Sequence, residues 1–148
     1  MPLLHLAFST GKQCYLPVLH PFLAGRLWFV PWTPATPMQL NRFNIPEPVY
    51  RPAEICKPQW LDIIITPLLG FDQQCHRLGM GGGFYDRTLA RLRTASRPDR
   101  ALLVGVAHDI QQCEQLTVAP WDIPLHHIIT PRCHYCCESH KKRFSNAG

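Results

Sequence analysis

Residues 61–69, LDIIITPLL, carry the strongest structural signal in the chain. Ile63, Ile64 and Ile65 form a β-branched apolar run without alternation. Such a run is typical of a strand that is buried on both faces in a parallel sheet covered by helices. Similar apolar runs follow at residues 101–107 (ALLVGVA) and 128–130 (IIT). The sequence therefore predicts a buried sheet built around these three segments.

The segments between these runs contain helix signals. In residues 84–92, Tyr85, Leu89 and Leu92 fall on one side of a helix at i, i+4 and i+7. Residues 110–116 form a second helix candidate after Asp109. Strands alternating with helices predict an α/β fold: a three-layer, Rossmann-like domain with a mostly parallel sheet and helices on both faces.

The residues before this block are predicted to form shorter extended segments. Residues 13–19 (QCYLPVL) and 27–32 (LWFVPW) are each predicted to form a strand. Residues 31–58 are rich in proline, which removes a backbone donor and disfavours helix. Because this stretch also contains apolar side chains such as Met38 and Phe43, we interpret it as an ordered connection within one domain.

Composition limits the function classes. The 148 residues suffice for one globular domain, with 46% hydrophobic and 17% charged residues. A net charge of +5 suits an anionic ligand such as a polyphosphate or a folate. The basic residues are scattered, which argues against nucleic acid, and no apolar run is long enough for a membrane span. Seven cysteines without a secretory signal predict reduced thiols in the cytoplasm, and a monomer is expected.

The chemistry concentrates in residues 77–87, RLGMGGGFYDR, between a predicted strand and a predicted helix. A glycine turn that leads into a helix N-terminus presents free N–H groups to a phosphate. Arg77 is suited to pairing with phosphate oxygens, and Asp86 is a hard oxygen ligand for Mg²⁺. Two alternatives remain: the glycines form a plain turn, and Asp86 merely stabilises the first turn of the helix. The spacing matches neither a Walker loop nor a dinucleotide-binding fingerprint.

The surrounding block, residues 62–90, closely resembles the signature of the 5-formyltetrahydrofolate cyclo-ligases, also called 5,10-methenyltetrahydrofolate synthetases. In that family a buried strand leads through a Pro-x-x-x-Phe-Asp turn, here Pro67, Phe71 and Asp72, into the Arg-Leu-Gly glycine loop. The resemblance continues in GKQCYLPVLHP, NIPEP, VGVAHD and PWDIPLHHIITP, covers residues 11–131, and is strongest to the bacterial branch.

The resemblance implies an ATP- and Mg²⁺-dependent ligase of one-carbon metabolism. It would convert 5-formyltetrahydrofolate into 5,10-methenyltetrahydrofolate, ADP and phosphate. Arg77 and Tyr85 would be catalytic, Phe84 and Tyr85 would lie against the folate, and Asp86 and Asp122 would bind Mg²⁺. The ATP-binding residues implied by the motif are Arg77, Leu78, Gly79, Met80, Gly81, Gly82, Gly83, Phe84 and Tyr85. Asp122 has an alternative role as a turn-forming residue, and Trp121 is expected to pack rather than to contact ligand.

Two regions depart from the family pattern. Relatives normally begin with a basic helix, a strand and a loop whose Glu binds folate. The resemblance implies that residues 1–4 align with the helix that follows this loop. We therefore expect an N-terminally truncated domain over residues 1–131, with a catalytically impaired homologue that binds nucleotide or folate without turnover as the alternative. Residues 132–148 form a divergent basic tail, in which Cys133, Cys136 and His140 have a spacing compatible with zinc, with Cys137 or His134 as a fourth ligand. The alternative is a disordered basic tail. A third hypothesis is nucleic-acid binding by the HKKR segment of this tail.

Overall fold

The computed structural model describes residues 2–94 and 101–137, with the side chains of residues 93 and 94 excepted. The basic cluster at Lys141, Lys142 and Arg143, and His140 of the tail, lie outside the described residues.

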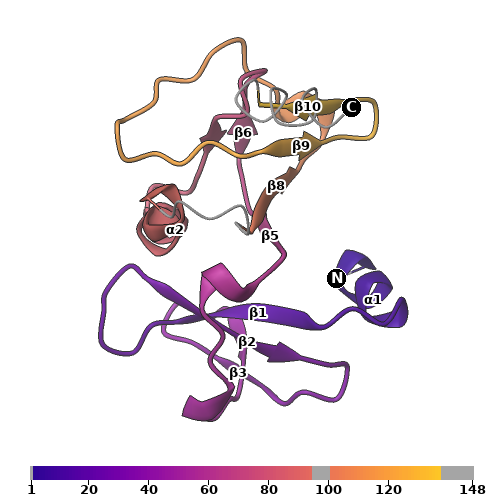
Figure 1. Ribbon diagram of the computed structural model, residues 1–148, viewed down its shortest axis with the longest axis vertical. Coiled ribbons are helices and arrows are strands. Elements are labelled where there is room, and N and C mark those ends of the chain that lie inside the picture. Colours follow the sequence, from indigo (N-terminus) through magenta and orange to yellow (C-terminus); the bar gives the residue numbers. More distant parts are fainter. Residues whose placement is uncertain (1, 95–100, 138–148) are drawn as a thin grey trace.

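The three apolar runs form one sheet, as predicted. Its four strands lie in the order β10-β9-β8-β5, and Figure 1 shows them in the upper half of the molecule. The β5–β8 and β8–β9 pairs are parallel, and β9–β10 is antiparallel. The bounds are β5 (Ile63–Thr66), β8 (Leu102–Val106), β9 (His127–Ile129) and β10 (His134–Cys136).

The burial predicted for the first run is wrong. Ile64 and Thr66 are buried, but Ile63 and Ile65 are 57% and 46% exposed. Successive side chains of a strand point to opposite faces, so only one face of β5 is covered by the described residues. The apolar run therefore does not distinguish a strand buried on both faces from one whose second face is open.

The helix content differs from the prediction. Helix α2 (Phe84–Thr94) is confirmed, and Leu89 and Leu92 are buried. A further helix, α1 (Pro2–Ser9), lies where the resemblance implied one; it has no buried residue and contacts β1. These are the two α-helices of the described residues, so helices on both faces and a three-layer Rossmann-like arrangement are not confirmed.

The predicted helix over residues 110–116 is also wrong. A single 3₁₀ turn, η3 (Asp109–Gln111), replaces it. The backbone N–H of Cys113 donates to the carbonyl of Phe71 (2.7 Å), and that of Leu116 donates to the Asp72 carboxylate (3.2 Å). Since these donors are bound to another segment, they do not form the i to i−4 ladder of a helix.

The residues that precede β5 form the lower half of the molecule in Figure 1, separate from the four-stranded sheet above. As predicted, β1 (Cys14–Leu19) and β2 (Leu27–Trp32) are strands, and they pair antiparallel. The proline-rich stretch is ordered, as interpreted above. It contains the antiparallel pair β3 (Met38–Leu40) and β4 (Pro46–Pro48), followed by the 3₁₀ turns η1 (Pro52–Glu54) and η2 (Pro58–Trp60).

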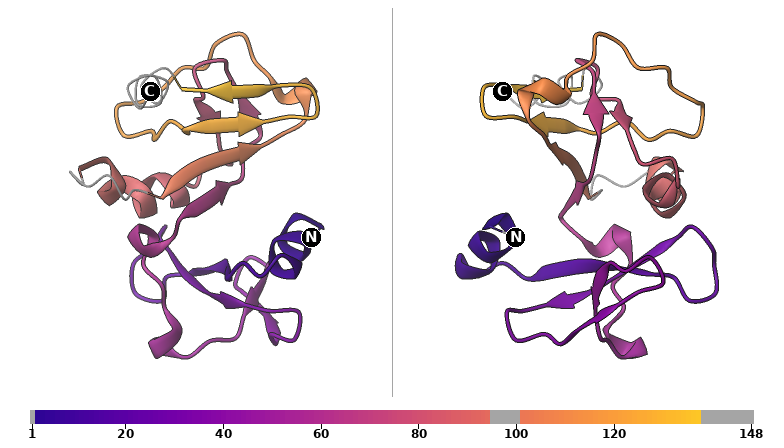
Figure 2. Two further views of the ribbon diagram at one scale, coloured as in Figure 1. Left: turned by 45° about the vertical axis from the view of Figure 1, so that its right-hand side comes forward. Right: turned by 180° about the vertical axis from the view of Figure 1, so that it is seen from behind.

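One core joins the two halves. Phe29 of β2 packs in the same cluster as Ile64, Leu89 and Ile128, and the backbone N–H of Cys56 donates to the Phe29 carbonyl at 2.7 Å. Both views of Figure 2 show α2 lying between the sheet and the β1–β2 hairpin. The helix that follows the glycine loop is thus held from two sides.

None of the seven cysteines, all of which lie within the described residues, forms a disulfide. In the described part of the chain, no helix has both the length and the apolar character needed to cross a membrane.

Candidate active site

The glycine loop connects a short hairpin to helix α2. Strands β6 (Gly70–Phe71) and β7 (Arg77–Leu78) pair antiparallel, and the loop runs from Gly79 to Gly83. Gly83 has φ +61°, and a β-carbon there would lie 2.8 Å from the Arg87 guanidinium. The positive φ therefore favours glycine at this position, and a side chain here would also displace the Arg87 guanidinium. Leu78 and Met80 are 50% and 85% exposed, so the loop faces solvent.

Arg77 and Asp86 form an ion pair beneath this loop. Nη2 of Arg77 lies 2.8 Å from Oδ1 of Asp86, with side-chain exposures of 6% and 18%. The guanidinium carbon of Arg77 is 5.8 Å from the centroid of the Tyr85 ring. Within the described residues, Nε of Arg77 is buried and has no hydrogen-bond partner. A buried donor without a partner is costly, so this nitrogen is suited to an acceptor that arrives with a ligand.

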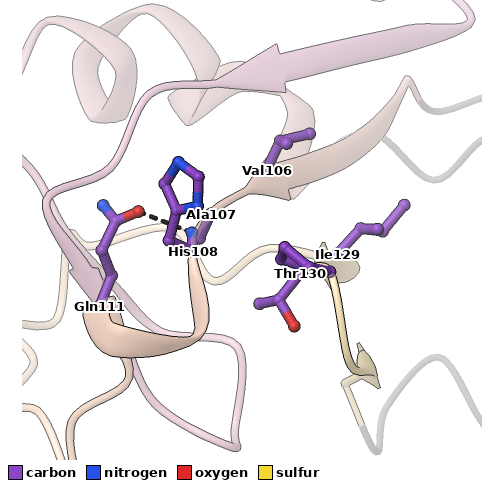
Figure 3. A pocket seen from close by; sticks show the side chains of 7 residues that line it. Val106, Ala107, His108, Gln111, Ile129 and Thr130 are labelled. Atoms are coloured by element: carbon purple, nitrogen blue, oxygen red, sulfur yellow. Dashed lines mark hydrogen bonds between the residues drawn. The ribbon is translucent and has the colours of Figure 1, made fainter.

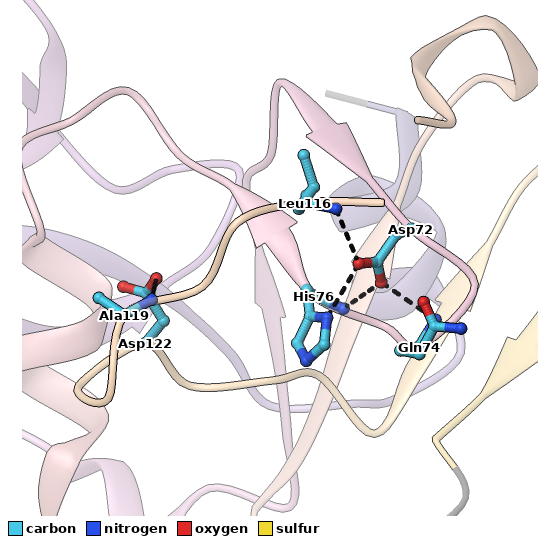
Figure 4. A network of polar contacts seen from close by, with 6 residues as sticks. All are labelled: Asp72, Gln74, His76, Leu116, Ala119 and Asp122. Atoms are coloured by element: carbon cyan, nitrogen blue, oxygen red, sulfur yellow. Dashed lines mark hydrogen bonds and ion pairs between the residues drawn. The ribbon is translucent and has the colours of Figure 1, made fainter. Parts of the chain in front are cut away.

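Asp86 also ties the loop to the distant PWDIP segment. Its Oδ1 accepts a hydrogen bond from the backbone N–H of Ile123 at 3.1 Å. Asp122 is therefore next in sequence to a residue bound to Asp86. Its own Oδ2 accepts from the N–H of Ala119 at 2.8 Å, a contact visible in Figure 4. The turn-forming role considered for Asp122 is thus observed.

The two carboxylates are chemically suited to Mg²⁺. Each engages one oxygen, Oδ1 of Asp86 and Oδ2 of Asp122, in the contacts above, while its other oxygen makes no hydrogen bond within the described residues. Mg²⁺ is usually bound by one or two carboxylates together with substrate phosphates. The described residues contain no group of three His, Cys, Asp or Glu side chains that could hold a metal ion.

Aromatic side chains border the loop. Burial raises the pKa of the Tyr85 phenol, while the Arg77 charge opposes that rise, so the hydroxyl stays protonated at neutral pH. The Phe84 ring meets Phe43 of the proline-rich stretch edge to face, with centroids 6.1 Å apart. Trp121, expected to pack, is instead 70% exposed. The rings of Phe84 and Tyr85 therefore follow directly after the loop, and the ring of Phe43 packs against Phe84.

Sequence reasoning missed Arg87. Its Nε donates to the carbonyl of Gly25 at 3.0 Å, and its Nη2 donates to the carbonyl of Gly82. Arg87 therefore clamps the glycine loop to the β1–β2 turn, 62 residues away in sequence. Its position at the end of the glycine motif was the only available signal, because the Gly25 partner follows from tertiary contact alone.

A second polar network supports the hairpin before the loop. Asp72 is fully buried and accepts hydrogen bonds from the N–H groups of Gln74, His76 and Leu116 and from Nδ1 of His76 (Figure 4). Burial by itself raises the pKa of the Asp72 carboxyl, but the side-chain and backbone hydrogen bonds outweigh it and hold this pKa below its usual value. Asp72 thus fixes the turn from which Arg77 emerges.

A hollow of about 350 Å³ lies elsewhere, at the carboxyl ends of β8 and β9 (Figure 3). Its walls include Val106, His108, Gln111 and Ile129, and no residue of the glycine loop. Asp109, which precedes the segment predicted as a helix, accepts a hydrogen bond from the Thr130 hydroxyl at 2.6 Å. Carboxyl ends of parallel strands are common ligand sites, but this hollow is mainly apolar and carries no cluster of charges.

Comparison with known proteins assigns this arrangement to a family. Residues 1–131 match the model of the 5-formyltetrahydrofolate cyclo-ligase family. The chain belongs to this family. The cyclo-ligases of Escherichia coli K12 and Haemophilus influenzae are 45% and 43% identical over 130 and 127 residues, which are 88% and 86% of this chain.

Solved structures agree on the fold. The 5,10-methenyltetrahydrofolate synthetase of Aquifex aeolicus is 30% identical and superposes with a TM-score of 0.72 over 93% of this chain. That of Mycoplasma pneumoniae is 22% identical, with a TM-score of 0.57 over 84%, and supports the fold alone. The chain spans about two thirds of its relatives' length: 69% and 66% of the two cyclo-ligases and 64% and 60% of the two solved chains.

The site residues that the cyclo-ligase resemblance implied are largely brought together. Arg77 contacts both Asp86 and the ring of Tyr85, and Asp86 accepts a hydrogen bond from the residue after Asp122. Their roles toward ATP, folate and Mg²⁺ stay predictions.

Proposed function

We propose that this chain catalyses the ATP- and Mg²⁺-dependent conversion of 5-formyltetrahydrofolate into 5,10-methenyltetrahydrofolate, ADP and phosphate. The observation that most supports this proposal is the Arg77–Asp86 ion pair beneath a solvent-exposed glycine loop at a helix N-terminus. The names of the relatives support the folate reaction.

The reaction needs activation of a poor leaving group. In the proposed route the formyl oxygen takes the γ-phosphoryl group and ADP leaves. N10 then attacks the formyl carbon, and phosphate departs with the former formyl oxygen. Enzymes contribute to such phosphoryl transfer mainly by positioning the reactants and stabilising charge. Bound Mg²⁺ would neutralise part of the charge on the nucleotide phosphates.

The side chains of this site match those tasks. The N–H groups of residues 79–83 and the start of α2 provide a phosphate cradle. Arg77 has a buried nitrogen with no partner among the described residues, and it is suited to a phosphate oxygen. Tyr85, held protonated by burial, is suited to donate a hydrogen bond rather than to act as a base. Phe84 and Tyr85 offer rings for a flat pterin.

The direct test follows the absorbance of the methenyl product with ATP, Mg²⁺ and 5-formyltetrahydrofolate. Arg77→Lys is the informative variant, because it keeps the charge beside Asp86 but removes the planar fork. We expect kcat/KM to fall about 10²–10³-fold, the usual cost of losing one charge-stabilising donor. Arg51→Lys, at an exposed position of the same residue type, serves as the matched control and should leave kcat/KM unchanged.

Two other outcomes have definite meanings. If the folded chain is stabilised against heat by MgATP but forms no product, the alternative applies: a homologue that binds ligand without turnover. If it shows neither stabilisation nor product, or if Arg77→Lys matches the control, the assignment of this site is wrong.

A further inference from the structure

The β9–β10 hairpin carries a pair of histidines that the proposed reaction does not use. Nε2 of His134 lies 2.9 Å from Nδ1 of His127. The ring centroids are 4.9 Å apart, and the ring planes are tilted by 40°. In this contact one nitrogen donates a proton and the other accepts it, so a single proton is shared between two good metal ligands.

The strand register holds these two side chains on one face. Ile128 is fully buried, and the ring of Tyr135 packs against that of Phe71 with centroids 5.2 Å apart. Side chains alternate along a strand. His127 precedes Ile128 and His134 precedes Tyr135, so both histidines point to the face opposite these two buried contacts. His134 is exposed. The pairing of the histidines therefore follows from the main chain of the hairpin.

We propose that His127 and His134 chelate a divalent transition-metal ion, with water completing the coordination. Imidazole nitrogen suits Ni²⁺, Cu²⁺ and Zn²⁺, at distances of roughly 2.0–2.1 Å for zinc. Two nitrogens 2.9 Å apart then subtend about 90° at the metal, the angle of neighbouring ligands in octahedral or square-planar geometry. Tetrahedral Zn²⁺ needs the nitrogens to separate by about 0.5 Å more. Ni²⁺ therefore fits the pair with the smaller adjustment.

This site differs from the zinc pattern considered for the tail. His134 pairs with His127 rather than with a cysteine. Cys133 lies in the β9–β10 turn, where its N–H donates to the Thr130 hydroxyl at 3.0 Å. Cys136 is opposite His127 in the register. However, within residues 2–94 and 101–137 no three His, Cys, Asp or Glu side chains are grouped to hold a metal. Two protein ligands are therefore assigned.

The experiment titrates Ni²⁺ into the reduced chain and follows the amide signals by NMR, because the paramagnetic ion broadens signals near its site. We expect broadening centred on residues 127–129 and 134–136. His134→Gln and His127→Gln should each weaken binding at least about tenfold, and the double variant no further, because losing one arm removes the chelate. His5→Gln, an exposed histidine on α1, is the matched control and should keep full affinity.

Variants at two other residues of the zinc pattern separate that pattern from the histidine pair. Cys136→Ser and His140→Gln should leave Ni²⁺ affinity within about threefold, since the chelate effect resides in the two imidazoles. The proposal is overturned if either of these abolishes binding, or if broadening appears elsewhere. It is also overturned if His134→Gln, with an unchanged circular dichroism spectrum and melting temperature, binds Ni²⁺ as the parent chain does. This experiment measures Ni²⁺ binding and not folate turnover. Its result therefore does not depend on whether the chain has the proposed activity.

Discussion

Asp72 shows how a single buried carboxylate shapes the residues before the glycine loop. Its carboxylate accepts four hydrogen bonds. Three come from Gln74 and His76 in the following turn, and one comes from the N–H of Leu116, 44 residues away in sequence. Because these hydrogen bonds favour the charged form, the carboxyl stays ionised although it is buried.

Asp72→Asn is expected to destabilise the chain by about 2–4 kcal/mol at neutral pH, because an amide cannot accept all of these bonds. The folded-state pKa of Asp72 is lowered, so its stabilising contribution is full above the unfolded-state pKa of about 3.9. It is lost as pH falls below that value, through the folded-state pKa. Urea unfolding of both chains between pH 7 and pH 3 should therefore show a difference that shrinks in acid. Glu114→Gln, at an exposed position, is the control. A difference independent of pH would contradict this account.

Gly83 and Gly11 allow backbone strain to be separated from a local clash. Both have positive φ, +61° and +79°, but only a β-carbon at Gly83 meets another group, the Arg87 guanidinium. Alanine at either position should cost about 1–2 kcal/mol in thermal unfolding, the usual penalty of a left-handed conformation for a residue with a side chain. Gly83→Ala should in addition lower kcat/KM at least about tenfold, through displacement of the phosphate cradle. Equal activity of the two variants would argue against a role of this loop in catalysis.

At the scale of elements, β5 is covered on one face only by the described residues. Ile64 is 2% exposed, whereas Ile65 is 46% exposed. Ile64→Ala should therefore cost about 2–4 kcal/mol, and Ile65→Ala about 1 kcal/mol or less, in chemical denaturation. The two substitutions remove the same atoms from neighbouring positions, so each is the other's control. Similar losses would mean that the second face of β5 is covered in solution.

At the scale of the molecule, two hydrogen bonds within the described residues link the β1–β2 hairpin to helix α2. The N–H of Leu27 donates to the Thr88 hydroxyl at 2.9 Å, and Arg87 donates to the Gly25 carbonyl at 3.0 Å. Both bonds hold helix α2, and therefore the glycine loop, against the β1–β2 hairpin.

Thr88→Val tests this joint with a side chain of the same shape. It leaves the Leu27 N–H without an acceptor, and we expect a loss of about 1–3 kcal/mol. In thermal unfolding this corresponds to about 3 °C for each kcal/mol at this chain length. Thr10→Val removes an exposed hydroxyl that donates to the Ala7 carbonyl and should change stability by less than about 0.5 kcal/mol. If Thr88→Val behaved like the control, this bond would contribute nothing to the joint.

The sequence by itself determined the elements whose signals are local. The strands β1, β2, β5, β8 and β9 and helix α2 follow from apolar runs and helical spacing, and the glycine loop and the family follow from one contiguous block. Patterns of this kind depend on residues that are close in the sequence, so they can be recognised without knowledge of the fold.

The tertiary structure alone decided features that depend on distant partners. Residues 110–116 read as a helix, but their N–H groups bond to Phe71 and Asp72. The exposure of Ile65, the Arg87 contact with Gly25, and the meeting of His127 with His134 each depend on which segment lies alongside. Burial and long-range pairing are properties of the packed molecule. The order of apolar and polar residues shows which side chains are suited to burial, but it does not show which distant segment packs against them.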